Sequence, residues 1–170
     1  MINIHLAIAL FTIFAAWRWA DWKHWRRYHP TMLYITAAGF LYEYLTDDFE
    51  LWAFHNVLLP NVEIVVIIYA VITMPLSILL YLSRYPTEKW TRQLGYIILW
   101  IAIYGVVELL LQLNGGIVYK NGWNFGYSLL FDAIMFPMLV LHLNKPLWAY
   151  PISVVIVVLL MFLFKVPIYE

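Results

Sequence analysis

Residues 62–83 read VEIVVIIYAVITMPLSILLYLS, an apolar run in which Glu63, at the start, is the only charged residue. A helix of about 20 residues crosses the roughly 30 Å hydrocarbon layer of a membrane, so this run predicts a membrane-spanning helix. Five further apolar runs of similar length lie on either side of it. The six predicted spans are residues 2–19, 31–46, 62–83, 94–113, 126–143 and 146–166. They predict an all-α integral membrane bundle of six transmembrane helices, with residues 1–170 as a single transmembrane domain.

Composition supports the same fold class. Hydrophobic residues make up 65% of the 170 residues and charged residues 12%, with a mean hydropathy of +0.79. So much apolar surface cannot be hidden inside a water-soluble globule of this size. The ten basic and ten acidic residues balance, which gives no reason to expect a nucleic-acid partner. The expected partners are membrane lipids, and the oligomeric state stays open.

The basic residues predict the orientation of the bundle. Only two of the ten, Lys120 and Lys165, fall on one side of the predicted spans. The other side carries Arg18, Lys23, Arg26, Arg27, Arg84, Lys89, Arg92 and Lys145. The positive-inside rule places these connectors in the cytoplasm and both termini outside. The first span is not expected to be a cleaved signal, because its charges follow the apolar core.

The spans group into three hairpins, each turning at a basic connector that contains proline. Spans three and five also share an internal proline, in ITMPLSILLYL at 72–82 and IMFPMLVLHL at 134–143. One explanation is a two-helix repeat, as is common in transporters. The other is a coincidence of two prolines among six apolar helices.

Three acidic residues, Glu43, Glu108 and Asp132, lie inside predicted spans that contain no Lys or Arg to pair with them. A rise of about 1.5 Å per residue places all three at similar depth in the outer half of the bilayer. We predict one acid-lined cavity in which these are the candidate catalytic groups, with at least one holding a proton at neutral pH. The alternative is that each acid is hydrogen-bonded and serves only helix packing.

Polar and aromatic side chains repeat every four residues in three spans, and such ridges face other helices because lipid cannot satisfy their hydrogen bonds. The ridges are Tyr96, Trp100, Tyr104, Glu108 and Gln112; Asn124, Ser128 and Asp132; and Tyr69, Thr73, Ser77 and Tyr81. The candidate substrate-binding residues near the acids are Tyr104, Trp100, Gln112, Ser128, Asn124 and Tyr42. Span six has no such ridge and is predicted to be a lipid-facing outer helix.

The segments outside the spans offer weaker candidates. Residues 47–56 are predicted to lie along the outer surface and residues 117–125 to form a small hairpin around Asn121 and Gly122; both are either lids or ordinary interface loops. His55 is a candidate proton shuttle. The tryptophans and cations of residues 17–29 predict an interfacial anchor against anionic lipid, with a headgroup or phosphate site as the alternative.

The sequence lacks the motifs of several common kinds of catalytic and cofactor site. The chain has no cysteine and no HExxH or paired ExxH motif, so no metal site is predicted, and carboxylates alone give only a weak case for one. Walker A, dinucleotide-binding and GxSxG patterns are also missing. We therefore expect no cofactor.

The order of four motifs resembles a known family: WRWADWKHWRRYHPTMLY at 17–34, LYEYL at 41–45, NGWN at 121–124 and SLLFDAIMFPMLVLH at 128–142. Over nearly its whole length the chain is similar to an uncharacterised family of small multi-span inner-membrane proteins from spore-forming Firmicutes. The resemblance implies a multi-pass protein of the bacterial plasma membrane, with no assigned activity and no catalytic residues to transfer. Integral-membrane terpene cyclases are similar only in placing carboxylic acids among aromatic residues.

Two main hypotheses for function follow from these residues. In the first, an acid-lined, aromatic-rich cavity binds a small lipophilic molecule, with general-acid chemistry on a prenyl-type or lipid substrate. In the second, the acids belong to a proton- or cation-coupled transporter or channel with bending points at Pro75 and Pro137. A non-catalytic membrane scaffold is a third interpretation. A closed aromatic cavity would favour the first, and a polar path through to the cytoplasmic face would favour the second.

Overall fold

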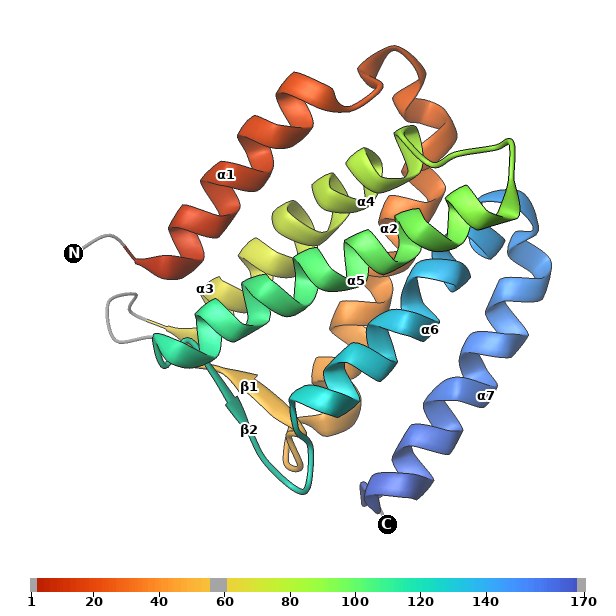
Figure 1. Cartoon of the computed structure of the whole chain (residues 1–170). Helices are drawn as coiled ribbons and strands as arrows, with labels where there is room; N and C mark the ends of the chain where they lie inside the picture. Colours follow the sequence, from red (N-terminus) through yellow and green to blue (C-terminus); the bar gives the residue numbers. More distant parts are fainter. Residues whose placement is uncertain (1–2, 56–60, 168–170) are drawn as a thin grey trace.

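The structure is a computed structural model that describes residues 3–55 and 61–167. It is almost entirely helical (Figure 1). The helices are α1 (Ile4–Trp19), α2 (Trp25–Thr46), α3 (Val62–Ile67), α4 (Met74–Ser83), α5 (Trp90–Leu113), α6 (Phe125–Asn144) and α7 (Pro146–Phe164). A short 3-10 turn, η1 (Trp22–His24), precedes α2, and a π-helical segment, η2 (Ile68–Thr73), joins α3 to α4. Two short strands are β1 (Trp52–Phe54) and β2 (Ile117–Tyr119).

Four helical segments of the described chain are long and apolar enough to cross a membrane: Val62–Ser83, Trp90–Leu113, Phe125–Asn144 and Pro146–Phe164. The segments Ile4–Trp19 and Trp22–Thr46 meet at 88° and qualify together as one bent segment. The prediction of an all-α fold is confirmed, and these four segments have the length and apolar composition that a membrane span needs. The crossing by six helices stays a prediction.

The helices lie side by side in a bundle with two distinct ends. Helix α2 packs against η2, α4 and α6, while α5 and α7 each pack against α6, and α1 packs against η2 and α4. Connectors 20–24, 84–89 and 145 share one end, here called the connector end, and β1 and β2 lie at the other, the sheet end (Figure 1). The basic connectors therefore share one end, as the sequence predicts. Helix α2 begins six residues before the predicted start of span two, at Trp25.

The π-helical segment η2 is explained by Pro75. In η2 the Met74 amide donates to the Tyr69 carbonyl, five residues back, and Pro75 has no amide hydrogen to donate. The carbonyl of Ala70 is thereby left without its usual helical partner. The Thr36 hydroxyl of α2 donates to it at 2.7 Å. This bond joins α2 to η2 at the level where the helix widens.

A small antiparallel sheet covers the sheet end. Trp52 pairs with Tyr119, Ala53 with Val118 and Phe54 with Ile117. The expected turn around Asn121 and Gly122 is present, with positive φ values of 49° and 86°. However, the predicted local hairpin of residues 117–125 is wrong, because β2 pairs with β1 from the loop that follows α2. Strand partners so far apart in sequence leave no local signal.

Aromatic rings fill the space between α4 and α5. Tyr81, Trp100, Tyr104 and Phe136 have neighbouring ring centroids 4.9 to 6.3 Å apart. The Tyr81 hydroxyl donates to the Phe136 carbonyl at 3.2 Å, so the polar end of this buried ring is satisfied. We call these four residues the aromatic layer. The predicted inward orientation of the third-span ridge is confirmed, because Tyr69, Thr73, Ser77 and Tyr81 are all buried.

Helix α7 lies at the edge of the bundle against α6. Ala149 is its only buried residue. Val154, Val158 and Phe162 are among its exposed apolar side chains. This agrees with the prediction of an outer helix that presents its apolar surface to lipid.

Candidate functional site

Asp132 occupies the inner face of α6 without a partner. The residue is 6% exposed. Among the residues that the structure describes, its carboxyl group accepts no hydrogen bond and forms no ion pair. The charged form of so largely buried a carboxyl group is costly unless a hydrogen-bond donor or a cation compensates for the lost hydration. Asp132 is therefore the least satisfied acidic group of the described bundle.

Glu108 lies on the neighbouring helix α5, close enough to Asp132 for the two groups to interact electrostatically. Gly105, one turn earlier, explains the close approach of the two helices. A Cβ atom at Gly105 would lie 2.8 Å from a methyl group of Leu129 on α6. A larger residue here would have to displace the Leu129 and Phe125 side chains of α6 near the acids. We call Glu108 and Asp132 the carboxyl pair.

The sheet supplies a hydrogen-bond donor to the carboxyl pair. The Tyr119 hydroxyl, at the end of β2, donates to Oε1 of Glu108 at 2.6 Å. Burial, together with Glu108, raises the pKa of Tyr119 above its usual range, so Tyr119 stays a neutral donor. Tyr119 thus links the loop region of the sheet end to Glu108.

Two further residues extend this network. The Ser128 hydroxyl lies near enough to interact with Tyr119, and it accepts a hydrogen bond from the indole Nε1 of Trp123 at 2.9 Å. Ser128 is one helical turn before Asp132, and both are buried on the same face of α6. Two hydrogen bonds, from Trp123 to Ser128 and from Tyr119 to Glu108, therefore lie close together beside Asp132.

The aromatic layer lies on the other side of Asp132. Tyr104 is close enough to interact electrostatically with Asp132, and its hydroxyl is hydrogen-bonded to Ser77 at 2.6 Å. The ring of Tyr104 meets Phe136 edge to face at 5.0 Å. Trp100 lies behind them, 7% exposed. The rings separate the carboxyl pair from the connector end.

Glu43 does not join the carboxyl pair. It is half-buried on α2, three residues before the helix ends, and the acidic groups that interact with it are Glu50 and Asp47. The structure therefore brings together two of the three predicted acids. The third shares their end of the bundle but lies among other carboxylates.

The remaining predicted binding residues divide by position. Ser128, Tyr104 and Trp100 lie around the carboxyl pair, as described above. Gln112 is exposed near the end of α5. The side chain of Asn124 caps α6, because its Oδ1 accepts from the amides of Gly126 and Tyr127 at 2.9 and 3.2 Å.

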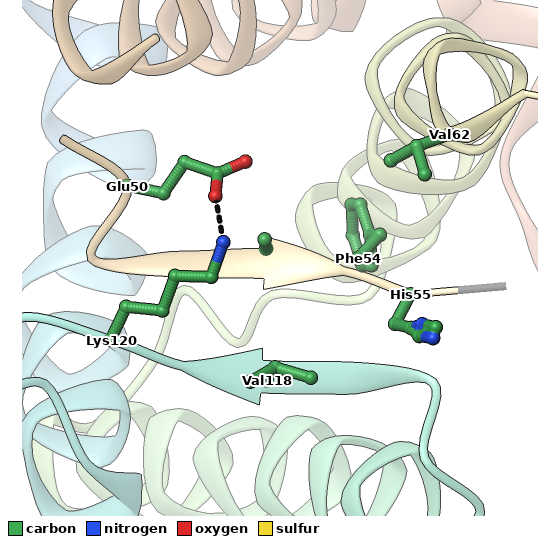
Figure 2. A pocket seen from close by; sticks show the side chains of 7 residues that line it. Glu50, Phe54, His55, Val62, Val118 and Lys120 are labelled. Atoms are coloured by element: carbon green, nitrogen blue, oxygen red, sulfur yellow. Dashed lines mark hydrogen bonds and ion pairs between the residues drawn. The ribbon is translucent and has the colours of Figure 1, made fainter. Parts of the chain in front are cut away.

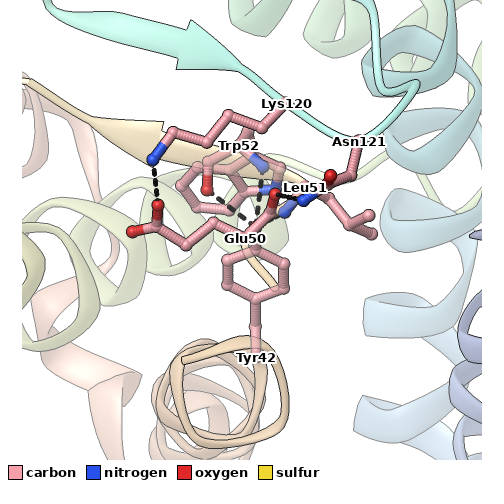
Figure 3. A network of polar contacts seen from close by, with 6 residues as sticks. All are labelled: Tyr42, Glu50, Leu51, Trp52, Lys120 and Asn121. Atoms are coloured by element: carbon pink, nitrogen blue, oxygen red, sulfur yellow. Dashed lines mark hydrogen bonds and ion pairs between the residues drawn. The ribbon is translucent and has the colours of Figure 1, made fainter. Parts of the chain in front are cut away.

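Tyr42 holds the loop that leads into β1 (Figure 3). Its hydroxyl accepts from the amides of Leu51 and Trp52 at 3.2 and 2.9 Å and donates to the Trp52 carbonyl at 2.7 Å. Its ring stacks on Trp52 with centroids 4.5 Å apart. In the same network Lys120 forms an ion pair with Glu50. These contacts show how Tyr42 fixes the sheet onto α2.

A separate pocket of about 350 Å³ lies beside the sheet (Figure 2). Its lining residues are Glu50, Ala53, Phe54, His55, Val62, Val118 and Lys120. Because successive strand residues point to opposite faces, Val118 lines this pocket while Tyr119 reaches Glu108. His55, the candidate proton shuttle, therefore borders this pocket and not the carboxyl pair.

The sequence analysis missed Tyr119 and Trp123. Tyr119 lies outside the helical repeats, just before the Asn121–Gly122 turn. Only the pairing of β2 with β1 directs its side chain toward Glu108. Within residues 3–55 and 61–167, no three His, Asp or Glu side chains are grouped to hold a metal ion.

No protein family, curated protein or solved structure matches the chain. The resemblance to the Firmicutes membrane family therefore stays a prediction. The function has to be argued from the geometry of the site alone.

Proposed function

We propose that this protein binds a small lipophilic molecule at the carboxyl pair and acts on it as a membrane-embedded proton donor. The observation that carries the proposal is the largely buried Asp132, whose carboxyl group has no hydrogen-bond or ion-pair partner among residues 3–55 and 61–167 and lies beside Glu108. We further propose a multi-pass location in the bacterial plasma membrane, with the sheet end outside.

The carboxyl pair is expected to hold a proton because no described Lys or Arg side chain neutralises it. Two neighbouring carboxyl groups that no Lys or Arg neutralises repel each other when both are charged, and they titrate as one unit. The lower-energy arrangement keeps at least one proton on the pair at neutral pH. Glu108, which accepts the Tyr119 hydrogen bond, is the better anion, so we assign the transferable proton to Asp132.

The aromatic layer supports a lipophilic substrate. Faces of Trp and Tyr rings attract positive charge, which develops when a double bond or carbonyl oxygen of an apolar molecule is protonated. The same rings exclude water, which favours proton transfer to a weak base over loss of the proton to solvent. General-acid chemistry on a prenyl chain or another lipid fits these groups.

The proposal is tested by native mass spectrometry and lipid extraction of the gently purified protein. Asp132→Asn and Glu108→Gln should each lose a lipophilic molecule that the wild type retains, and Asp132→Asn should lose the infrared band of a protonated carboxyl group. Glu88→Gln, an exposed acid at the connector end, is the matched control and should keep both. Correctly folded Asn and Gln variants that retain the same molecules as wild type would contradict the proposal.

A second candidate, proton- or cation-coupled transport, is favoured by one observation. The hydroxyl of Thr73, at the end of η2, is buried without a hydrogen-bond partner among the described residues, and π-helical turns frequently mark functional sites. Proton flux in liposomes tests this candidate: flux that Asp132→Asn abolishes would favour transport over a closed binding site.

A further inference from the structure

The connector end concentrates positive charge. Eight Lys and Arg residues lie there: Arg18, Lys23, Arg26, Arg27, Arg84, Lys89, Arg92 and Lys145. Only two carboxylates, Asp21 and Glu88, share this end, which leaves a net charge of +6. The sheet half of the described chain holds the carboxyl pair and the acids around the end of α2. The two ends therefore differ strongly in charge.

Both carboxylates of the connector end are already engaged. Asp21 Oδ2 contacts Nδ1 of His24 at 2.8 Å, and the hydrogen bond from His24 lowers the pKa of Asp21. Glu88 pairs with Arg92. Across the described part of the chain, no carboxylate lies within 4.0 Å of the other seven cations. These seven cations are therefore free of intramolecular ion pairs with the described carboxylates and can meet an anionic ligand.

The bend between α1 and α2 gathers these cations. The two helices meet at 88°, with Arg18 in the last turn of α1 and Arg26 and Arg27 in the first turn of α2. Arg84 joins them from the α4–α5 connector, because its Nε donates to the Trp19 carbonyl at 2.9 Å. Three arginines thus flank one bend of the chain, and a hydrogen bond fixes the guanidinium of a fourth, Arg84, beside it.

Exposed tryptophans surround the same end. Six of the nine tryptophans are 39 to 72% exposed there: Trp17, Trp19, Trp22, Trp25, Trp90 and Trp148. Tryptophan concentrates at the headgroup level of membranes, where its ring meets the acyl chains and its N–H meets polar groups. Tryptophans at this depth place the neighbouring guanidinium groups at the level of lipid phosphates. Guanidinium binds phosphate oxygens through paired hydrogen bonds.

We propose that the connector end is a binding surface for anionic phospholipid headgroups, with the α1–α2 bend as its principal contact. The occupant is a lipid because the cations lie between exposed tryptophans and not on a fully polar surface. It is an anionic lipid because a zwitterionic headgroup cannot neutralise an excess of +6. This inference does not depend on the carboxyl pair.

The test compares lipids around the whole protein in nanodiscs made from an equal mixture of phosphatidylglycerol and phosphatidylcholine. Each Lys or Arg at a membrane surface strengthens attachment to anionic lipid about fivefold. A triple variant, Arg18→Gln with Arg26→Gln and Arg27→Gln, should therefore lower the enrichment of retained phosphatidylglycerol by roughly a hundredfold if the three effects multiply. The control variant, Lys120→Gln with Lys165→Gln, changes cations away from the connector end and should keep the wild-type enrichment.

Tryptophan quenching by brominated lipids gives an independent readout on the unmodified protein. Brominated phosphatidylglycerol should quench more strongly than brominated phosphatidylcholine at low salt, and the difference should shrink at about 1 M salt, where the screening length falls to about 3 Å. Equal quenching by the two lipids in wild type would overturn the proposal, even if the triple variant fails to fold. Soluble glycerophosphate, which has no acyl chains, should not remove the difference in quenching between the two brominated lipids. If it does, the cations bind a soluble ligand, and this outcome would also overturn the proposal.

Discussion

The Thr36 hydroxyl of α2 donates a 2.7 Å hydrogen bond to the Ala70 carbonyl, which Pro75 leaves without a helical partner. One side chain on α2 thus satisfies a backbone group that the π-helical segment exposes. In an apolar bundle this carbonyl has no water to bond instead.

Replacing Thr36 by Val keeps the shape of the side chain and removes this bond. Because the Ala70 carbonyl is then buried and unpaired, we expect a loss of about 1–3 kcal/mol in the free energy of unfolding. Thermal or denaturant unfolding in detergent measures it. Thr12→Val is the matched control, since the Thr12 hydroxyl bonds only the Ile8 carbonyl of its own helix. Equal losses in the two variants would show that the interhelical bond has no special role.

Tyr119→Phe removes the donor to Glu108 and leaves the ring. A hydrogen bond to a charged group contributes about 1.5–3 kcal/mol, so we expect a loss of that order in the free energy of unfolding. Thermal or denaturant unfolding in detergent measures the loss. Tyr127→Phe is the control, because no described residue bonds the Tyr127 hydroxyl. Equal stabilities of Tyr119→Phe and Tyr127→Phe would mean that the hydrogen bond to Glu108 does not stabilise the fold.

Gly105→Leu should separate α5 from α6 at the carboxyl pair, because even a Cβ atom there would lie 2.8 Å from Leu129. Overpacking of this kind costs about 1–3 kcal/mol. The same substitution at Gly95, earlier on α5, meets no atom within 4 Å and should leave stability almost unchanged. Unfolding midpoints of the two variants give the comparison. A Gly95 variant as unstable as the Gly105 variant would show that the loss does not come from the close approach of α5 and α6, since Leu has a higher helix propensity than Gly at both positions.

Tyr42→Phe should loosen the sheet without unfolding the helices. The amides of Leu51 and Trp52 lose their acceptor, and the Trp52 carbonyl loses a donor. Hydrogen exchange should rise at residues 51–54 while the exchange of α4 and α6 stays slow. Tyr44→Phe, whose side chain is 75% exposed, should change neither. Faster exchange throughout the bundle would mean that Tyr42 supports the whole fold.

Sequence periodicity predicted the helices and their inner faces well. Tyr69, Ser77, Tyr81 and Asp132 are buried as their four-residue spacing indicates, because an apolar solvent leaves polar side chains only the bundle interior. Depth counting placed Glu43, Glu108 and Asp132 near one end of the bundle. It could not give their positions around the helix axes, so it could not separate Glu43 from the other two.

The parts that sequence could not supply depend on contacts between distant segments. Tyr119 reaches Glu108 only because β2 pairs with β1, and neither strand shows that pairing in its own residues. Asn124 and Tyr42 were predicted as binding residues from their polarity near the acids. Their side chains instead satisfy backbone groups at a helix start and a loop, a role that polar residues commonly take at such positions.

The sheet also sets an order of assembly during synthesis. Trp52 and Tyr119, partners in the sheet, are 67 positions apart, and two of the long apolar helices, Val62–Ser83 and Trp90–Leu113, are made between them. At about 5–20 residues per second, β1 leaves the ribosome roughly 3–13 s before its partner. During that interval the backbone groups of β1 have no strand partner. β1 can pair only after α5 and then β2 have been synthesised. The sheet therefore forms late, and it can form only when the helices between its two strands are in their final positions.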